Sequence, residues 1–144
     1  MRVLTNPSGW FTLEVPDDWD TETQDSVTTL RGPDRVGVLY LSGARHAGGK
    51  QRSFGGADFL SRFLGSLGLA VPEEAIHSFE GQGCRIYAFT RESAGIHWSY
   101  WSVTDDETAL LISYTCRAED LPRESNQVHG MVRSVRLYHS AQAH

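Results

Sequence analysis

The sequence predicts an α+β fold, with a single antiparallel sheet of about six or seven strands flanked by two main helices. Short runs of alternating apolar and polar residues recur along the chain, and turns of hairpin length separate them. Two further segments carry apolar residues at helical spacing. Since 144 residues suffice for one core, we expect one domain over residues 1–144, with a loosely held tail at 139–144.

The first predicted strand is WFTLEV, residues 10–15, in which apolar and polar side chains alternate. Pro16 ends this strand because proline cannot donate a backbone hydrogen bond. Trp19 follows in a cluster of acids, and we expect it to fill one end of the core rather than line a binding cage. Two more strands, near 26–31 and 36–42, are joined by a Gly-Pro-Asp turn.

The first predicted helix spans residues 56–68, because its apolar residues fall on one stripe. The residues of that stripe are Phe59, Leu60, Phe63, Leu64 and Leu67. Four strands follow, near 76–80, 83–91, 95–104 and 108–116, separated by the turn-rich pieces EGQG, ESAG and TDDE.

The second predicted helix spans residues 120–133. Asp120 is a suitable N-cap residue, and proline is tolerated in a first helical turn, where Pro122 lies. A short strand at 134–137 is expected to follow.

The motif Phe11-x-Leu13-x-Val15-Pro16-x-x-Trp19, the order of the elements and the closing segment ALLISYTCRAEDLPRESNQVHGMVRSVRL resemble the PsbP-like superfamily. The resemblance covers nearly the whole chain. It implies an antiparallel sheet with helices on its faces, and a protein that binds other proteins rather than catalysing a reaction. These motifs are signatures of a fold, so the resemblance transfers no catalytic residues. This chain lacks the export signal and the lipobox cysteine of the bacterial lipoprotein DcrB, another member.

The net charge of −5, without runs of like charge, argues against nucleic acid and anionic membranes as partners. No apolar segment has the length of a signal peptide or a membrane span, so we expect a protein of the bacterial cytoplasm. Two cysteines and scattered histidines predict no disulfide scaffold, no metal and no cofactor.

The hairpins between residues 84 and 116 hold the candidate groove. With ESAG as a four-residue loop and the next turn around Asp106, one sheet face collects seven large residues as the expected main core. These are Tyr87, Phe89, Trp98, Tyr100, Leu110, Ile112 and Tyr114. The opposite face carries hydroxyls, one imidazole and one indole, which suit a polar-lined groove with Trp101 as its floor. The candidate groove residues are Thr90, His97, Ser99, Trp101, Ser113 and Thr115.

Two interpretations of this face remain open. It is either a ligand or peptide groove, or the surface on which a helix packs, and we favour the helix because layered folds usually cover both faces of a sheet. His97 also raises a hydrolytic enzyme as a third possible function. No G-x-S-x-G nucleophile motif accompanies it, so we assign no catalytic residue.

The glycine-rich stretch GARHAGGKQRSFGG departs from the phosphate-binding P-loop motif, and we interpret it as a loop that contacts a partner. Its candidate residues are Arg45, His46, Lys50 and Arg52. We expect a non-enzymatic protein-binding or adaptor module whose partner is another protein, existing as a monomer or homodimer. The alternative is a small-ligand-binding accessory protein that uses the Trp101 groove.

Overall fold

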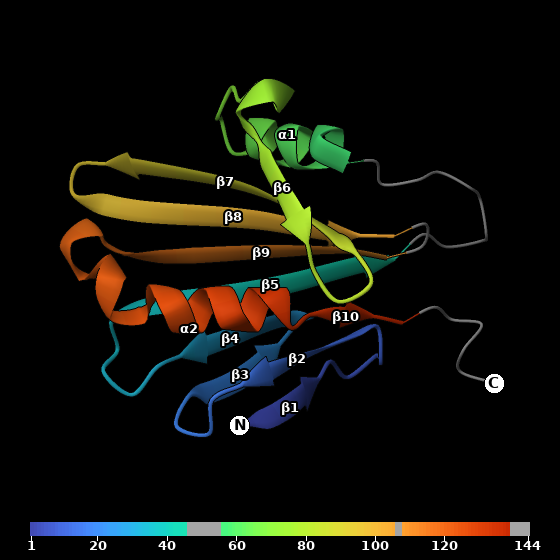
Figure 1. Cartoon of the computed structure of the whole chain (residues 1–144), viewed down its shortest axis with the longest axis vertical. Helices are drawn as coiled ribbons and strands as arrows, with labels where there is room; N and C mark the ends of the chain where they lie inside the picture. Colours follow the sequence, from blue (N-terminus) through green and yellow to red (C-terminus); the bar gives the residue numbers. More distant parts are fainter. Residues whose placement is uncertain (46–55, 106–107, 139–144) are drawn as a thin grey trace.

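The structure, a computed structural model, describes residues 1–45, 56–105 and 108–138. Its main sheet has seven antiparallel strands in the order β3-β4-β5-β9-β8-β7-β6 (Figure 1). The predicted α+β class, an antiparallel sheet flanked by two helices, is confirmed. The strands are β3 (Asp20–Gln24), β4 (Val27–Arg31), β5 (Gly37–Arg45), β6 (His77–Glu80), β7 (Arg85–Ser93), β8 (Ile96–Thr104) and β9 (Thr108–Arg117).

A second, three-stranded sheet is added to the predicted one. Its order is β1-β2-β10, with β1 (Arg2–Thr5) and β10 (Arg136–Leu137) antiparallel to β2 (Phe11–Val15) on either side. The predicted alternation in β2 is confirmed, since Phe11, Leu13 and Val15 are buried. This small sheet therefore joins segments from both ends of the described chain.

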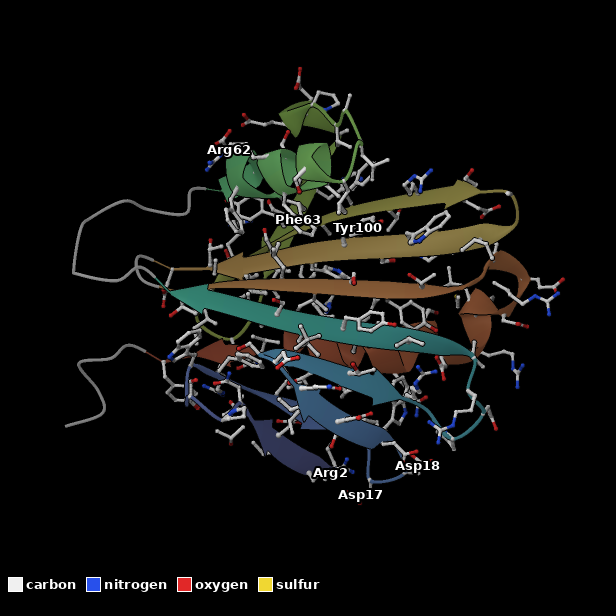
Figure 2. The ribbon with its side chains drawn as sticks, turned by 180° about the vertical axis from the view of Figure 1, so that it is seen from behind. Arg2, Asp17, Asp18, Arg62, Phe63 and Tyr100 are labelled. Carbon is white, nitrogen blue, oxygen red and sulfur yellow. The ribbon has the colours of Figure 1, made fainter. Side chains whose placement is uncertain are left out.

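The two helices lie on opposite faces of the main sheet. We call the face that carries Trp101 and Ile112 the inner face, and the face that carries Tyr100 and Ser113 the outer face. Helix α2 (Leu121–Arg133) covers the inner face together with β2. Helix α1 (Gly56–Ser66) lies on the outer face, over β7 and β8 (Figure 2).

Two short 3₁₀ turns, Glu73–Ala75 and Ala118–Asp120, precede β6 and α2. In the three described ranges, no helix has both the length and the apolar character needed to cross a membrane.

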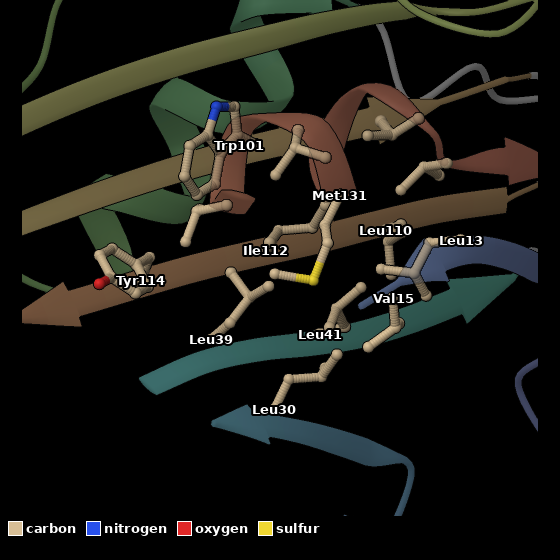
Figure 3. Close-up of a cluster of buried hydrophobic side chains, with 14 of the residues drawn as sticks. Leu13, Val15, Leu30, Leu39, Leu41, Trp101, Leu110, Ile112, Tyr114 and Met131 are labelled. Carbon is tan, nitrogen blue, oxygen red and sulfur yellow. The ribbon is translucent and has the colours of Figure 1, made fainter. Parts of the chain in front are cut away.

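The main core fills the space between the inner face, β2 and α2. Leu39 and Leu41 of β5 and Ile112 of β9 meet Val15 of β2 and Met131 of α2 (Figure 3). Trp19 belongs to the same cluster with 2% of its surface exposed, which confirms that it fills the core. The smaller cluster on the outer face consists of Leu60, Leu64, Val71 and Tyr100 and the side chains packed against them.

The hairpin between β7 and β8 is tighter than predicted. Ser93 pairs with Ile96, so the loop is only Ala94 and Gly95, both with positive φ (52° and 78°). Positive φ at both central residues is typical of a type I′ turn, whose twist suits a two-residue hairpin. The predicted four-residue loop paired Arg91 with Ile96, so the observed register between β7 and β8 differs from the predicted one by two residues. A shift of two leaves every side chain on its predicted face.

The predicted register between β8 and β9 is wrong by one residue. Trp101 pairs with Ile112 and Val103 with Leu110. A one-residue shift moves a whole strand's side chains to the other face. Leu110, Ile112 and Tyr114 therefore lie in the main core on the inner face. The four aromatic residues expected beside them contribute instead to the smaller outer cluster, namely Tyr87, Phe89, Trp98 and Tyr100.

Candidate functional site

A pocket of about 300 Å³ lies between the inner face of the main sheet and helix α2. We call it the Trp101 pocket. Strands β7, β8 and β9 form one wall and the first two turns of α2 form the other. The lining residues are Thr90, His97, Ser99, Trp101, Tyr114, Leu121, Ser125, Val128 and His129.

The sheet wall results from strand alternation and register. His97, Ser99 and Trp101 are every second residue of β8, so their side chains share the inner face. Ser99 pairs with Thr90 of β7 on one side and with Tyr114 of β9 on the other. A small hydroxyl residue thus lies at the centre of this wall, beside the much larger Trp101 and Tyr114.

The helix wall follows from helical spacing. Residues 121, 125, 128 and 129 recur at intervals that place them on one side of a helix. Val128 is buried, whereas His129 is exposed and forms part of the pocket mouth. The His129 ring stands edge-on to the Trp101 indole, with ring centroids 6.0 Å apart and planes at 89°. Helix α2 packs on the inner face, and a pocket remains between the helix and the sheet.

The strongest polar feature of the pocket is a hydrogen bond of 2.6 Å between His97 Nε2 and Ser99 Oγ. Both side chains are buried. Burial lowers the pKa of His97, opposed by the carboxylate of Glu92, which stands opposite it on β7. His129 is exposed as a residue, but its ring is partly desolvated against the fold, which lowers its pKa, and the nearby Arg133 lowers it further. Both imidazoles are therefore neutral at pH 7.

Tyr114 connects the pocket wall to a buried carboxyl group. Its hydroxyl donates a 2.6 Å hydrogen bond to Oε1 of Glu124, which is 4% exposed. Burial, followed by this bond to Glu124, raises the pKa of the Tyr114 hydroxyl. The ring lies close to the β5 backbone, since a Cβ added at Gly37 would stand 2.6 Å from the Tyr114 hydroxyl oxygen. Only glycine permits this approach.

The His97–Ser99 pair lacks the other parts of a serine hydrolase. A nucleophilic serine needs an imidazole oriented by a third group and free N–H donors for the oxyanion. Among the described residues, no carboxylate is hydrogen-bonded to the second ring nitrogen of His97. The β8 backbone lies between β7 and β9, so its N–H groups belong to the sheet ladder. The pair is suited to hydrogen bonding with a ligand rather than to acyl transfer.

The described ranges contain no cluster of three or more His, Cys, Asp or Glu residues that would hold a metal ion. The two cysteines, Cys84 and Cys116, are free thiols, and burial raises the pKa of both.

Four of the six predicted groove residues come together in the pocket, namely Thr90, His97, Ser99 and Trp101. Ser113 and Thr115 lie on the outer face instead, because of the one-residue difference in the β8–β9 register. The prediction missed five lining residues. Three of them, Leu121, Ser125 and His129, lie on one face of a helix, and the spacing in the sequence already indicates that face. Placing Tyr114 on the pocket face required the correct register between β8 and β9.

The predicted partner loop falls only partly within the described residues. Arg45 is the last residue of β5 and pairs with Thr108. His46, Lys50 and Arg52 lie outside the described residues.

The outer face over β9, β5 and β4 is not covered by any described helix (Figure 2). Tyr40 projects from its centre with 40% of its surface exposed, beside Ser113 on β9 and Thr29 on β4. At its border, the guanidinium of Arg91 lies 4.4 Å from the ring centroid of Trp98. Aromatic residues and arginine are enriched at protein interfaces, and Tyr40, Trp98 and Arg91 supply them here.

No family model and no curated protein matches this chain. The solved structures that are similar to it include two with a TM-score of 0.67 each. A crystal structure from Bacteroides thetaiotaomicron is 14% identical, and the match covers 97% of this chain and 49% of that one. The solution structure of cyanobacterial PsbP (CyanoP) from Synechocystis is 11% identical, with coverages of 95% and 92%. This chain thus spans about half the Bacteroides protein, and at these identities the similarity concerns the fold alone.

Proposed function

We propose that this chain, which has a PsbP-like fold, is a non-enzymatic accessory protein that binds a small ligand in the Trp101 pocket. The single observation that supports this proposal is the composition of the pocket between the sheet and α2. Trp101, Leu121 and Val128 offer apolar surface, while Ser99, His97 and Ser125 offer a few convergent polar groups. Ligand sites typically combine apolar walls with a small number of polar groups, and 300 Å³ is at the lower end of their size range.

A bulky residue at the pocket mouth tests this proposal. Ser125 lines the pocket from α2, so Ser125→Phe fills it, whereas the neighbouring Asn126 is exposed and Asn126→Phe adds the same ring on the solvent side. The probe is N-phenyl-1-naphthylamine, an uncharged dye that fluoresces in apolar sites. We expect saturable binding to the unmodified protein, at least tenfold weaker binding to Ser125→Phe, and unchanged binding to Asn126→Phe.

Equal binding of the dye to all three proteins contradicts the assignment of the ligand site to this pocket. Thermal unfolding of each variant, followed by circular dichroism, separates a blocked pocket from a damaged fold.

The second candidate function is the recognition of another protein through the outer face, and the uncovered surface around Tyr40 supports it. Arg45 and the three candidates outside the described residues, His46, Lys50 and Arg52, remain part of this proposal. Tyr40→Arg places a charge at the centre of the surface. A partner that the unmodified protein retains should be lost with Tyr40→Arg and kept with Ser125→Phe. The reverse pattern assigns the partner to the pocket.

We further propose a location in the bacterial cytoplasm. The free thiols Cys84 and Cys116 suit a reducing compartment, and the two similar structures described above come from bacteria. Fractionation of the source cells with an antibody against the chain tests this location.

A further inference from the structure

We propose that the Trp101 pocket selects uncharged ligands which combine a planar apolar ring with one hydroxyl group, and that the Ser99–His97 pair receives the hydroxyl. This inference rests on the ligand-binding function proposed above and adds the chemical class of the ligand.

The first argument is the charge of the lining. The nine lining residues include no Lys, Arg, Asp or Glu. Their titratable groups are two imidazoles and the Tyr114 hydroxyl. The pKa of His97 and of His129 is lowered, chiefly by burial, and that of Tyr114 is raised, so all three are neutral at pH 7. An ion that entered this pocket would lose hydration without meeting an opposite charge.

The second argument is the set of groups that face the imidazoles from neighbouring elements. His97 stands between Glu92 of β7 and the Cys116 thiol of β9. His129 is influenced by Arg133, whose guanidinium lies over the Phe79 ring, 5.0 Å from its centroid. On the helix side, the carboxyl group of Glu124 already accepts a hydrogen bond from the hydroxyl of Tyr114. These groups all lie outside the lining, so none of them offers a ligand a direct ion pair.

The third argument is the position of the hydrogen-bonding groups. Ser99 and His97 are 3% and 9% exposed, so their side chains belong to the buried wall of the pocket, unlike the exposed His129. A serine hydroxyl has one donor and two acceptor sites, and its bond to His97 leaves part of this capacity free. A ligand hydroxyl both donates and accepts, so it pairs with either tautomer of the imidazole. The Trp101 indole and the side chains of Leu121 and Val128 then contact the apolar ring.

Three probes of nearly the same shape test the selection by charge. Benzyl alcohol is neutral, while benzoate is an anion and benzylamine a cation at pH 7.5. Binding is followed by the NMR shift of the Trp101 indole N–H, assigned among the four tryptophans by its absence in Trp101→Phe. We expect benzyl alcohol to shift this signal saturably at millimolar concentration and both ions to bind at least tenfold more weakly.

Either ion binding as tightly as the alcohol overturns the selection by charge and leaves the ligand-binding function standing. No shift of the Trp101 signal with any of the three probes, nor with the neutral ring toluene, overturns the ligand-binding function and the selection together.

Ser99→Ala tests the role of the hydroxyl pair. We expect this variant to bind benzyl alcohol about fivefold more weakly, the usual effect of losing one hydrogen bond, and to bind toluene unchanged. Ser113→Ala is the matched control, since Ser113 is also a serine in the middle of the sheet but lies on the outer face. Equal loss of both probes in Ser99→Ala overturns the hydroxyl assignment.

Discussion

Tyr114 is the residue that links the pocket to the stability of the fold. Its ring lines the pocket on the sheet side, and its hydroxyl is the donor to the buried Glu124 of α2. Glu124 in turn lies against Gly32, where any side chain would collide with its carboxyl group. One hydrogen bond thus joins β9 to the helix that closes the pocket. A buried carboxyl group without this donor is costly.

We therefore predict that Tyr114→Phe lowers the free energy of unfolding by about 1–3 kcal/mol, the usual cost of leaving a buried polar group unpaired. Urea unfolding followed by circular dichroism measures this change. Tyr40→Phe removes the same atom from an exposed tyrosine, and it should change the free energy by no more than about 0.5 kcal/mol. Equal effects of the two variants would show that the bond to Glu124 adds nothing to stability.

At the scale of single elements, the sequence predicted the helices and strands that show a clear periodic pattern within one short stretch. The alternation in β2, the apolar stripe of α1 and the helical spacing in α2 lie close to their observed positions, because each follows from one short stretch of sequence. Strands β1 and β3 were missed. β3 (DTETQ) lies at the edge of the main sheet, and exposed polar edge strands show little alternation between buried and exposed residues.

The pocket was only partly predictable because it depends on two turns. The β7–β8 loop was predicted two residues too long, an even difference that kept Thr90, His97, Ser99 and Trp101 on one face. The predicted register between β8 and β9 differs from the observed one by one residue, an odd number. The prediction therefore placed Ser113 and Thr115 on the pocket face, where the structure has Tyr114. Whether a turn has an odd or an even number of residues determines which side chains of the next strand point inward. The composition of a stretch such as TDDE does not reveal how many of its residues belong to the turn.

At the scale of the whole molecule, the resemblance to the PsbP-like superfamily is confirmed for the fold. The architecture is asymmetric. The inner face is covered by α2 and the small sheet, whereas α1 covers only the β7–β8 side of the outer face (Figures 1 and 2). The pocket and the protein-facing surface proposed above therefore lie on opposite sides of one sheet. Variants on one side are controls for the other.

The two neutral imidazoles make the stability of the whole fold dependent on pH. The pKa of His97 and of His129 is lower in the folded protein than the usual value of about 6.5. Below pH 6.5 the unfolded chain thus binds more protons than the folded chain, and protonation favours unfolding. Stability should be highest above pH 6.5 and fall as the pH drops through the lowered pKa values.

We predict a lower urea midpoint at pH 5.5 than at pH 7.5, with the largest change below pH 6.5. This range lies above that in which exposed carboxylates usually titrate. The double variant His97→Gln/His129→Gln should show a smaller difference between the two pH values. A midpoint that rises on acidification, or a double variant with an undiminished difference, contradicts this assignment.

The pairing of β1 and β10 on either side of β2 has a consequence for the order of folding during synthesis. The first two strands leave the ribosome early, but β2 keeps one unpaired edge until residues 136–137 emerge more than a hundred residues later. The small sheet therefore closes only after translation has passed α2. Until then the nascent chain exposes a strand edge that a chaperone can bind.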